Sequence, residues 1–267
     1  MQGWLLQTAM AIRLHGVPLS QPFRSVAWAL LQKRLPFEVK MAVPGSTRKG
    51  GTGSKEFLAL NPTGNVPFLE DGDMRVSEAV AILVHLCQSN GWSDLYPYAA
   101  AGPLKSKVDE YCHWHHSNTR LLAPAYFAPL VRPDMAFEPV QLESFRAGAT
   151  RALVSLETAW LAGSPYIGGS GRMTIADLMA YEQVAEVAPQ FMNLMAFDSY
   201  PNLRAWMSRM EAAPYHTEAH AAVTALGDLS AFSPGDAAIM KLVGAASKAG
   251  FAALSTAAAK AEPASKL

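Results

Sequence analysis

The chain has 267 residues, of which 50% are hydrophobic, and this length allows one large domain or two of ordinary size. Its 22 Lys and Arg residues balance 22 Asp and Glu residues, so no overall charge recruits nucleic acid or an anionic membrane. The two cysteines, Cys87 and Cys112, provide neither a disulfide framework nor a Cys-x-x-Cys redox pair and are typical of a reducing compartment. We therefore expect a small molecule as the partner.

The first and last residues of the chain resemble segments that direct proteins within the cell. The first ten predict no membrane insertion, and the last three predict an organelle. Residues 1–10 contain no basic residue and no long apolar run, which indicates a loose leader and neither a secretory signal nor a membrane span. The last three residues, Ser265, Lys266 and Leu267, match a peroxisomal signal that an import receptor recognises. We expect a peroxisome or a related organelle, with the cytoplasm as the alternative.

Residues 11–96 predict a mixed α/β domain. Apolar and polar residues alternate over 12–15 and 37–41, as in strands with one buried face. Asp71-Gly72-Asp73 is a hairpin signal, and Ser77 is the expected cap of the helix that follows it. The predicted order is strand 12–15, a helix after Pro22, strand 37–41, helix 54–60, strands 66–70 and 74–76, and a helix that stops near Asn90.

Residues 102–230 predict an all-helical domain, and residues 231–267 form an Ala-rich extension. Thr174 and Asp177 are placed to form a capping box at the start of a helix, a structural feature without a catalytic role. The expected helices cover residues 104–123, 142–162, 175–187, 203–212 and a shorter segment beyond His216.

Three short segments predict one site for a peptide-like thiol: Ser20-Gln21-Pro22, Asn65-Val66-Pro67 and Ser77-Glu78-Ala79. Each lies where a strand ends or a helix begins. Together they offer a hydroxyl donor, an open stretch of backbone and the amino end of a helix, which favours anionic groups.

These segments resemble those of cytosolic glutathione transferases, most closely the theta class, over roughly residues 11–230. The matching stretches are Leu19 to Val26, Asn61-Pro62, Val66-Pro67, Asp71-Gly72-Asp73, Ser77 to Leu83, Asp109-Glu110-Tyr111 and Ile175 to Leu178. The resemblance implies a thioredoxin-like amino-terminal domain that binds glutathione, an all-α domain that shapes the electrophile site, and a homodimer. It also implies an extension that covers the active site up to about Leu254, with a plain spacer as the alternative.

In this family a serine at the position of Ser20 stabilises the glutathione thiolate. A free thiol has a pKa of about 8.5, and lowering it by about two units needs only about 2.7 kcal/mol. A charge-assisted hydrogen bond of about 1.5–3 kcal/mol together with the helix dipole is sufficient. The alternative for Ser20 is an ordinary helix cap.

The resemblance also implies the residues that bind the rest of glutathione. Val66 and a cis Pro67 present their backbone to the cysteinyl part, while the amides that open the helix at Ser77, Glu78 and Ala79 hold the γ-glutamyl end. Gln21, Asn65 and the basic Lys55 complete the predicted set. Ala79 replaces the usual Ser or Thr, so a modified or larger glutathione-containing thiol is an alternative ligand.

The run Cys112-His113-Trp114-His115-His116 has spacing that brings Cys and His to one helix face, as in a metal site. It offers no carboxylate or second Cys, so we predict no metal. The resemblance places this run where the family lines its electrophile pocket, which assigns Trp114 and His116 to that pocket; packing is the alternative for both. Arg120 matches an arginine that approaches the sulfur in theta enzymes, where a cation favours thiolate; a surface arginine is the alternative.

The predicted function is therefore a serine-type glutathione transferase, with glutathione as co-substrate and no metal. The thiolate attacks an electrophilic carbon of a small molecule, or a peroxide oxygen. A non-catalytic, transferase-like binding or assembly module is the alternative from another class.

Overall fold

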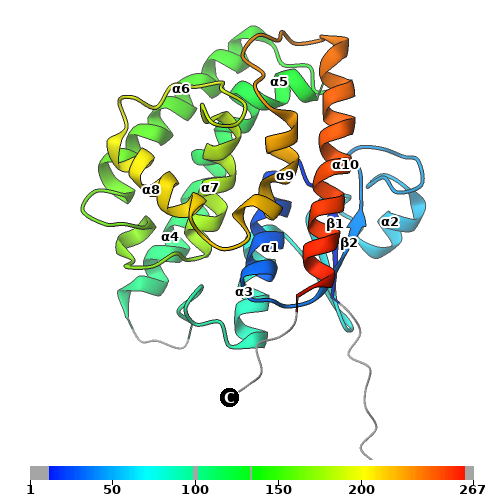
Figure 1. Cartoon of the computed structure of the whole chain (residues 1–267), viewed down its shortest axis with the longest axis horizontal. Helices are drawn as coiled ribbons and strands as arrows, with labels where there is room; N and C mark the ends of the chain where they lie inside the picture. Colours follow the sequence, from blue (N-terminus) through cyan, green and yellow to red (C-terminus); the bar gives the residue numbers. More distant parts are fainter. Residues whose placement is uncertain (1–11, 99–101, 133, 262–267) are drawn as a thin grey trace, which may run out of the picture.

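In the computed structural model, which describes residues 12–98, 102–132 and 134–261, the amino-terminal part folds around a four-stranded sheet (Figure 1). The strand order is β2-β1-β3-β4, with β1 parallel to β2 and antiparallel to β3. The elements are β1 (Ile12–Gly16), α1 (Gln21–Gln32), β2 (Phe37–Met41), α2 (Lys55–Leu60), β3 (Phe68–Asp71), β4 (Met74–Ser77) and α3 (Ala79–Asn90). The predicted strands and helices occur in the predicted order. The leader 1–10 and the signal 265–267 lie outside the described residues.

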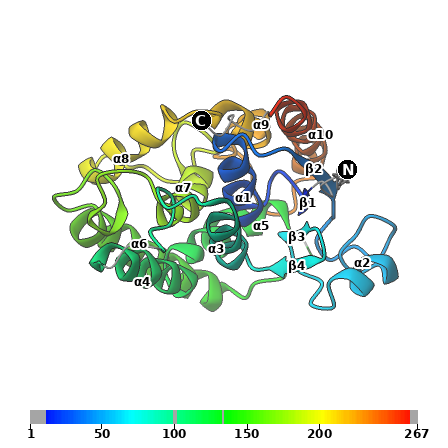
Figure 2. The ribbon, with the colours of Figure 1, turned by 90° about the horizontal axis from the view of Figure 1, so that it is seen from below.

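The alternating pattern of β1 places its residues on two different faces. Leu14 is fully buried, pairs with Val39 and Leu69, and belongs to the main core beside α1 and α3. His15 points the other way and packs on Phe57 of α2 and on Phe68. The sheet therefore lies between α2 and the pair α1 and α3, the helices that face the helical domain (Figure 2).

The carboxyl-terminal part is helical and is centred on α7. Every residue of α7 is buried, and Thr174 and Asp177 form the predicted capping box at its start. Asp177 also accepts a hydrogen bond from Trp206 of α8 at 2.9 Å, which confirms a structural role. The helices are α4 (Pro103–Ser117), α5 (Ala128–Val131), α6 (Pro139–Ser155), α7 (Ile175–Val187), α8 (Pro201–Glu211), α9 (His216–Leu226) and α10 (Ala237–Ala259).

The long helices expected over 104–123 and 142–162 are wrong in their bounds. α4 ends at Ser117 because Asn118 has non-helical dihedrals and its side chain bonds the carbonyl of Trp114 at 2.9 Å. A 3-10 turn, η1 (Thr119–Leu121), and a π-helical turn with Pro124, η2 (Ala123–Phe127), then lead into α5. α6 starts earlier than expected, at Pro139, because Glu138 and Gln141 form a capping box, and it ends in a second π-helical turn, Leu156–Trp160.

The Ala-rich extension forms α10, which packs along α9 and beside β2 (Figure 1). It is long and apolar enough to cross a membrane by length and composition, with a mean hydropathy of 1.3, and 22% of that window is buried. Its Gly250 is buried, and a Cβ there would lie 2.5 Å from Cβ of Ala222 and 2.8 Å from Cβ of Pro18. α10 thus supports the loop that connects β1 to α1 and leads to Ser20.

Candidate functional site

Ser20 is the residue that precedes α1, and its half-buried side chain makes no capping hydrogen bond to the helix. Its backbone is fixed on both sides: the N–H donates to the carbonyl of Val17 at 2.9 Å, and the carbonyl accepts from the N–H of Arg24 at 3.0 Å. Ser20 therefore does not act as an ordinary side-chain cap of α1. Its hydroxyl lies at the amino end of a 12-residue helix and makes no hydrogen bond to the backbone N–H groups of that helix.

A cavity of about 240 Å³ lies next to this loop, where the two domains meet. It brings together five of the six predicted residues of the second and third segments with four residues of the helical domain, of which His116 and Arg120 were predicted. Val66–Pro67 is a cis peptide bond, as the resemblance implies. The lining residues are Pro22, Asn65, Val66, Pro67, Glu78, Ala79, His115, His116, Arg120 and Met179; none of them belongs to α10, so the cover expected up to Leu254 does not line this cavity.

The expectation that Ser77 caps α3 is wrong. Ser77 is the last residue of β4 and pairs with Phe68, so its backbone is extended. The residue before the helix is Glu78, which turns the chain with φ 70° and ψ 119°. A positive φ is uncommon for a residue with a Cβ and is found preferentially at ligand-binding turns.

Five predicted residues are not among the lining residues: Ser20 and Ser77, described above, and Gln21, Lys55 and Trp114. Gln21 is buried and donates from Nε2 to a carboxylate oxygen of Glu186 on α7. Lys55 is exposed at the start of α2. Trp114 packs against Tyr111 and Trp160, with ring centroids 5.7 and 5.4 Å away.

The structure adds two lining residues that the sequence patterns did not assign to this site, His115 and Met179, and one buried neighbour outside the lining, Glu186. His115 lies on the inner face of α4 together with Val108, Tyr111 and Cys112, a helical spacing that the sequence already shows. Glu186 lies on α7 and contacts Gln21, the neighbour of Ser20. The available signal for Glu186 was the presence of acidic residues in an otherwise apolar helix.

Burial dominates the electrostatics around the cavity. It raises the pKa of Glu186 to about 8, against the opposing effects of Arg24, Gln21 and Arg120. It lowers the pKa of His115 to about 3, and Arg120 and His116 act in the same direction. It also lowers the pKa of Arg120, which Glu186 and Glu78 oppose. The site therefore combines an arginine with a neutral imidazole and a carboxyl group that favours its protonated form.

The two cysteines are not nucleophiles of this site. Cys87 and Cys112 are buried free thiols, and burial raises the pKa of each to about 12. Since the thiolate is the reactive form, a thiol for chemistry must come from a ligand. Among residues 12–98, 102–132 and 134–261, no group of three or more His, Cys, Asp or Glu side chains is placed to hold a metal ion.

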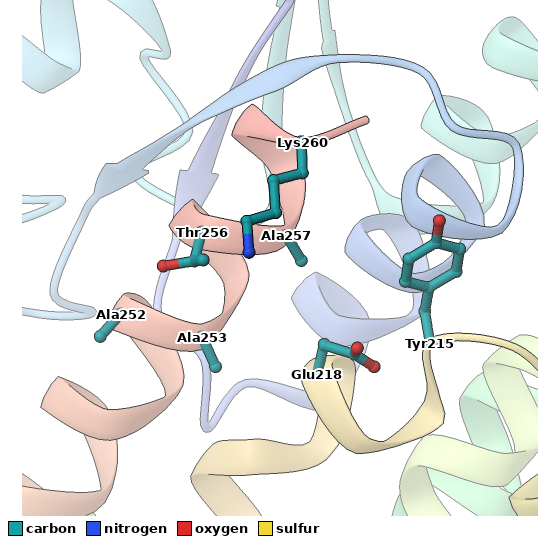
Figure 3. A pocket seen from close by; sticks show the side chains of 7 residues that line it. All are labelled: Tyr215, Glu218, Ala252, Ala253, Thr256, Ala257 and Lys260. Atoms are coloured by element: carbon teal, nitrogen blue, oxygen red, sulfur yellow. The ribbon is translucent and has the colours of Figure 1, made fainter. Parts of the chain in front are cut away.

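A second and larger hollow of about 540 Å³ lies between the start of α9 and the last turns of α10 (Figure 3). Tyr215 and Glu218 line one side, while the side on α10 consists of alanines with Thr256 and Lys260. None of the predicted site residues lies there. The cavity beside Ser20 is therefore the candidate site.

A thioredoxin-like domain joined to an all-helical domain, with the site between them, is the fold of glutathione transferases. Residues 14–93 match the family model "Glutathione S-transferase, N-terminal domain", and residues 119–214 match "Glutathione S-transferase, C-terminal domain". The chain therefore belongs to the glutathione S-transferase family, in a theta-like group, and is a glutathione transferase.

Individual relatives agree with this assignment. Human glutathione S-transferase theta-2 is 32% identical over 226 residues, which cover 81% of this chain and 88% of the relative. Human glutathione S-transferase theta-1 is 30% identical over 237 residues, covering 86% and 95%. The solved structure of human theta-2 in complex with glutathione and an unknown ligand matches with a TM-score of 0.69 at 26% identity, covering 94% of this chain and 100% of that one.

Proposed function

We propose that this enzyme is a serine-type transferase, in which Ser20 Oγ–H donates a hydrogen bond to the glutathione sulfur and keeps it as thiolate. The observation that supports this role is that the hydroxyl does not cap α1, while Pro22, two residues further along the chain, lines the cavity. The positive end of α1 and the Arg120 guanidinium add favourable electrostatic interactions with an anion.

The remaining predicted residues position the tripeptide. The cysteinyl backbone pairs with Val66 beside Pro67, and Glu78 attracts the γ-glutamyl ammonium while the first amides of α3 hold its carboxylate. Because the protein contributes no nucleophile of its own, the rate enhancement comes from thiolate formation and from holding the thiol next to the electrophile.

Titration of the bound thiol by its ultraviolet absorbance tests the role of Ser20. Ser20→Ala should raise the pKa of bound glutathione toward its free value of about 8.5 and lower kcat at least about tenfold, since a charge-assisted hydrogen bond is lost. Folding should be nearly unaffected because the hydroxyl does not cap α1. Ser208→Ala, at an exposed position of α8, is the control. An unchanged pKa of the thiol in Ser20→Ala would contradict the proposal.

The conjugation of an alkyl halide and the reduction of an organic hydroperoxide, measured side by side, separate the two reactions open to the thiolate. We propose carbon as the preferred target. A folded protein that neither binds immobilised glutathione nor turns over either substrate would instead be a binding module.

We also propose that the enzyme acts as a homodimer, as its theta-like character implies. Light scattering coupled to size-exclusion chromatography should give twice the mass of 28.7 kDa calculated for one chain. A single-chain mass at micromolar concentration would contradict this.

For the location we propose the peroxisome, through Ser265, Lys266 and Leu267. A fluorescent protein that ends in these residues should accumulate in peroxisomes. The same fusion with Leu267 deleted should be diffuse, and a diffuse signal from both would contradict the proposal.

A further inference from the structure

Glu186 links the helical domain to the residue that follows Ser20. It is fully buried in the last turn of α7, and its Oε2 accepts a hydrogen bond from Nε2 of Gln21, the first residue of α1. Gln21 is also buried, and it is 165 positions away in the sequence. α7 therefore holds α1 at the residue where the segment with Ser20 enters the helix.

The bond to Glu186 bears on Ser20 because the serine hydroxyl is placed by its own backbone. Ser20 has extended dihedrals, φ −78° and ψ 121°, and its side chain makes no hydrogen bond to α1. Arg24, further into the helix, is held by Glu182 at 2.6 Å, so α7 fixes the start of α1 at two points. A donor to a reacting atom must be held to within about half an ångström, which is the task of the residues that support it.

The protonated form of Glu186 is compatible with a nearby anion. Burial raises its pKa to about 8, and Glu182 on the same helix acts in the same direction, while Arg24 on α1 and Arg120 on η1 oppose it. A thiol with a pKa about two units below its free value of about 8.5 ionises at a pH at which this carboxyl group still carries its proton. Glu186 therefore holds Gln21 without a negative charge that would oppose the thiolate.

Two oxygens without a partner agree with a protonated Glu186. Among the described residues, Oε1 of Glu186 and Oε1 of Gln183 are both buried and accept no hydrogen bond. The two residues are three positions apart on α7 and are therefore neighbours on its surface. A proton on Glu186 gives this pair a donor, whereas two acceptors alone would both stay unmatched.

We propose that Glu186 is a positioning residue for glutathione transfer, which acts through Gln21 to hold the Ser20 hydroxyl against the bound sulfur. The inference rests on the proposed role of Ser20. Glu186 is not among the residues that line the cavity, so it contacts neither the thiol nor the electrophile. Its loss should therefore raise the pKa of bound glutathione and leave the affinity for the protonated thiol nearly the same.

Ultraviolet titration of the bound thiol tests the assignment. Glu186→Leu should raise the pKa of bound glutathione by about one unit, because the serine hydroxyl is still present but less well placed. The rate should then fall about fivefold at pH 6.5 and recover to nearly that of the unmodified enzyme at pH 8.5, where the thiol is ionised in both proteins. Glu186→Gln keeps an acceptor for Gln21 and should rescue most of the shift.

Glu157→Leu is the matched control for a loss of stability. Glu157 is also a buried carboxylate, and it accepts hydrogen bonds from the backbone N–H groups of Asn202 and Leu203 in the first turn of α8. This variant should be less stable than the unmodified enzyme and leave the pKa of bound glutathione unchanged. A shift as large as that of Glu186→Leu would overturn the proposal, since the shift would then follow stability and not position.

Double variants show whether Glu186 acts through Gln21 and Ser20. Gln21→Leu breaks the same hydrogen bond from α1 and should give the same shift, so it carries the test if Glu186→Leu fails to fold. Combining Glu186→Leu with Gln21→Leu, or with Ser20→Ala, should shift the pKa no further than the second variant does alone. Additive shifts, or no shift in Glu186→Leu and Gln21→Leu, would overturn the inference and leave the role of Ser20 intact. If Ser20→Ala itself leaves the pKa unchanged, the proposed function fails and this inference fails with it.

Discussion

Glu186 is an acidic side chain in a position that favours its neutral form. It is fully buried on α7, one of its oxygens accepts from Gln21, and the other has no partner among the described residues. Burial raises its pKa to about 8 in the folded protein. A group with a raised pKa contributes its full stability below the unfolded value and loses it as the pH rises through the folded value.

We therefore expect Glu186→Gln to stabilise the protein increasingly from about pH 5 to about pH 9, because glutamine resembles the protonated acid and has no proton to lose. The gain in the free energy of unfolding should be small at the acidic end and exceed about 1 kcal/mol at the alkaline end. Urea unfolding at several pH values measures it. Glu143→Gln, at an exposed position of α6, should show no such trend, and a gain independent of pH would exclude titration of Glu186 as its cause.

The sequence predicts those site residues that stand at chain turns, and it misses those that depend on packing. Pro67, Glu78 and Ala79 stand in short segments with a recognisable order, and the structure places all three at one cavity. His115 and Glu186 gain their significance from burial by other elements, which no local pattern reports. Lys55 and Trp114 show the converse: residue type and position in the chain suggested a site, but packing placed them elsewhere.

The contact of α10 with the loop before α1 links the carboxyl-terminal helix to the segment that holds Ser20. Gly250 allows this contact because it has no Cβ to collide with Ala222 and Pro18. Pro18 also accepts, through its carbonyl, a hydrogen bond of 3.2 Å from Arg24. The loop is thus held from α10 on one side and from α1 on the other.

Gly250→Ala should destabilise the protein by about 1–2 kcal/mol, because the overlap with Ala222 outweighs the gain of about 1 kcal/mol in helix propensity. The same variant should lower kcat, since Pro18 is two residues from Ser20. Gly244→Ala lies on the same helix with no atom within 4 Å of the added Cβ and should be neutral or stabilising. Thermal unfolding and turnover of both variants test this prediction. Equal stability and equal kcat of Gly250→Ala and Gly244→Ala would refute the proposed contact.

Polar side chains predicted some helix bounds correctly and others not: the cap expected at Ser77 is wrong, and the capping box of Glu138 and Gln141 was missed. The capping box of Thr174 and Asp177 was visible in the sequence and is present in the structure. The break of the 104–123 segment was not predicted, because Asn118 was assigned to a continuous helix although asparagine is a poor residue for a helix interior. The apolar periodicity continued across it because η1 and η2 also pack against the core.

A buried ionic network joins the two domains. Arg24 of α1 contacts Glu182 of α7 at 2.6 Å, and both side chains are buried. Glu182 also lies 3.0 Å from Nε2 of His220 on α9. Burial acts to raise the pKa of Glu182, but His220 and Arg24 outweigh it and hold that pKa below its usual value.

Removing one member of this network should be far more costly than removing an exposed pair. Arg24→Met should lower the free energy of unfolding by about 3–5 kcal/mol, because it leaves Glu182 with an uncompensated buried charge. Adding Glu182→Leu should restore part of that loss. Lys107→Met, which breaks an exposed pair with Glu110 on α4, should cost less than about 1 kcal/mol. Equal effects of Arg24→Met and Lys107→Met in urea would rule out the buried pair as a major contributor.

The cavity beside Ser20 draws its lining from both domains, with Val66 and Glu78 on one side and His115 and Arg120 on the other. Neither domain forms this cavity by itself. A slight separation of the two halves would disassemble it while every helix and strand stayed folded. Catalysis should therefore disappear at lower urea concentrations than helical circular dichroism does.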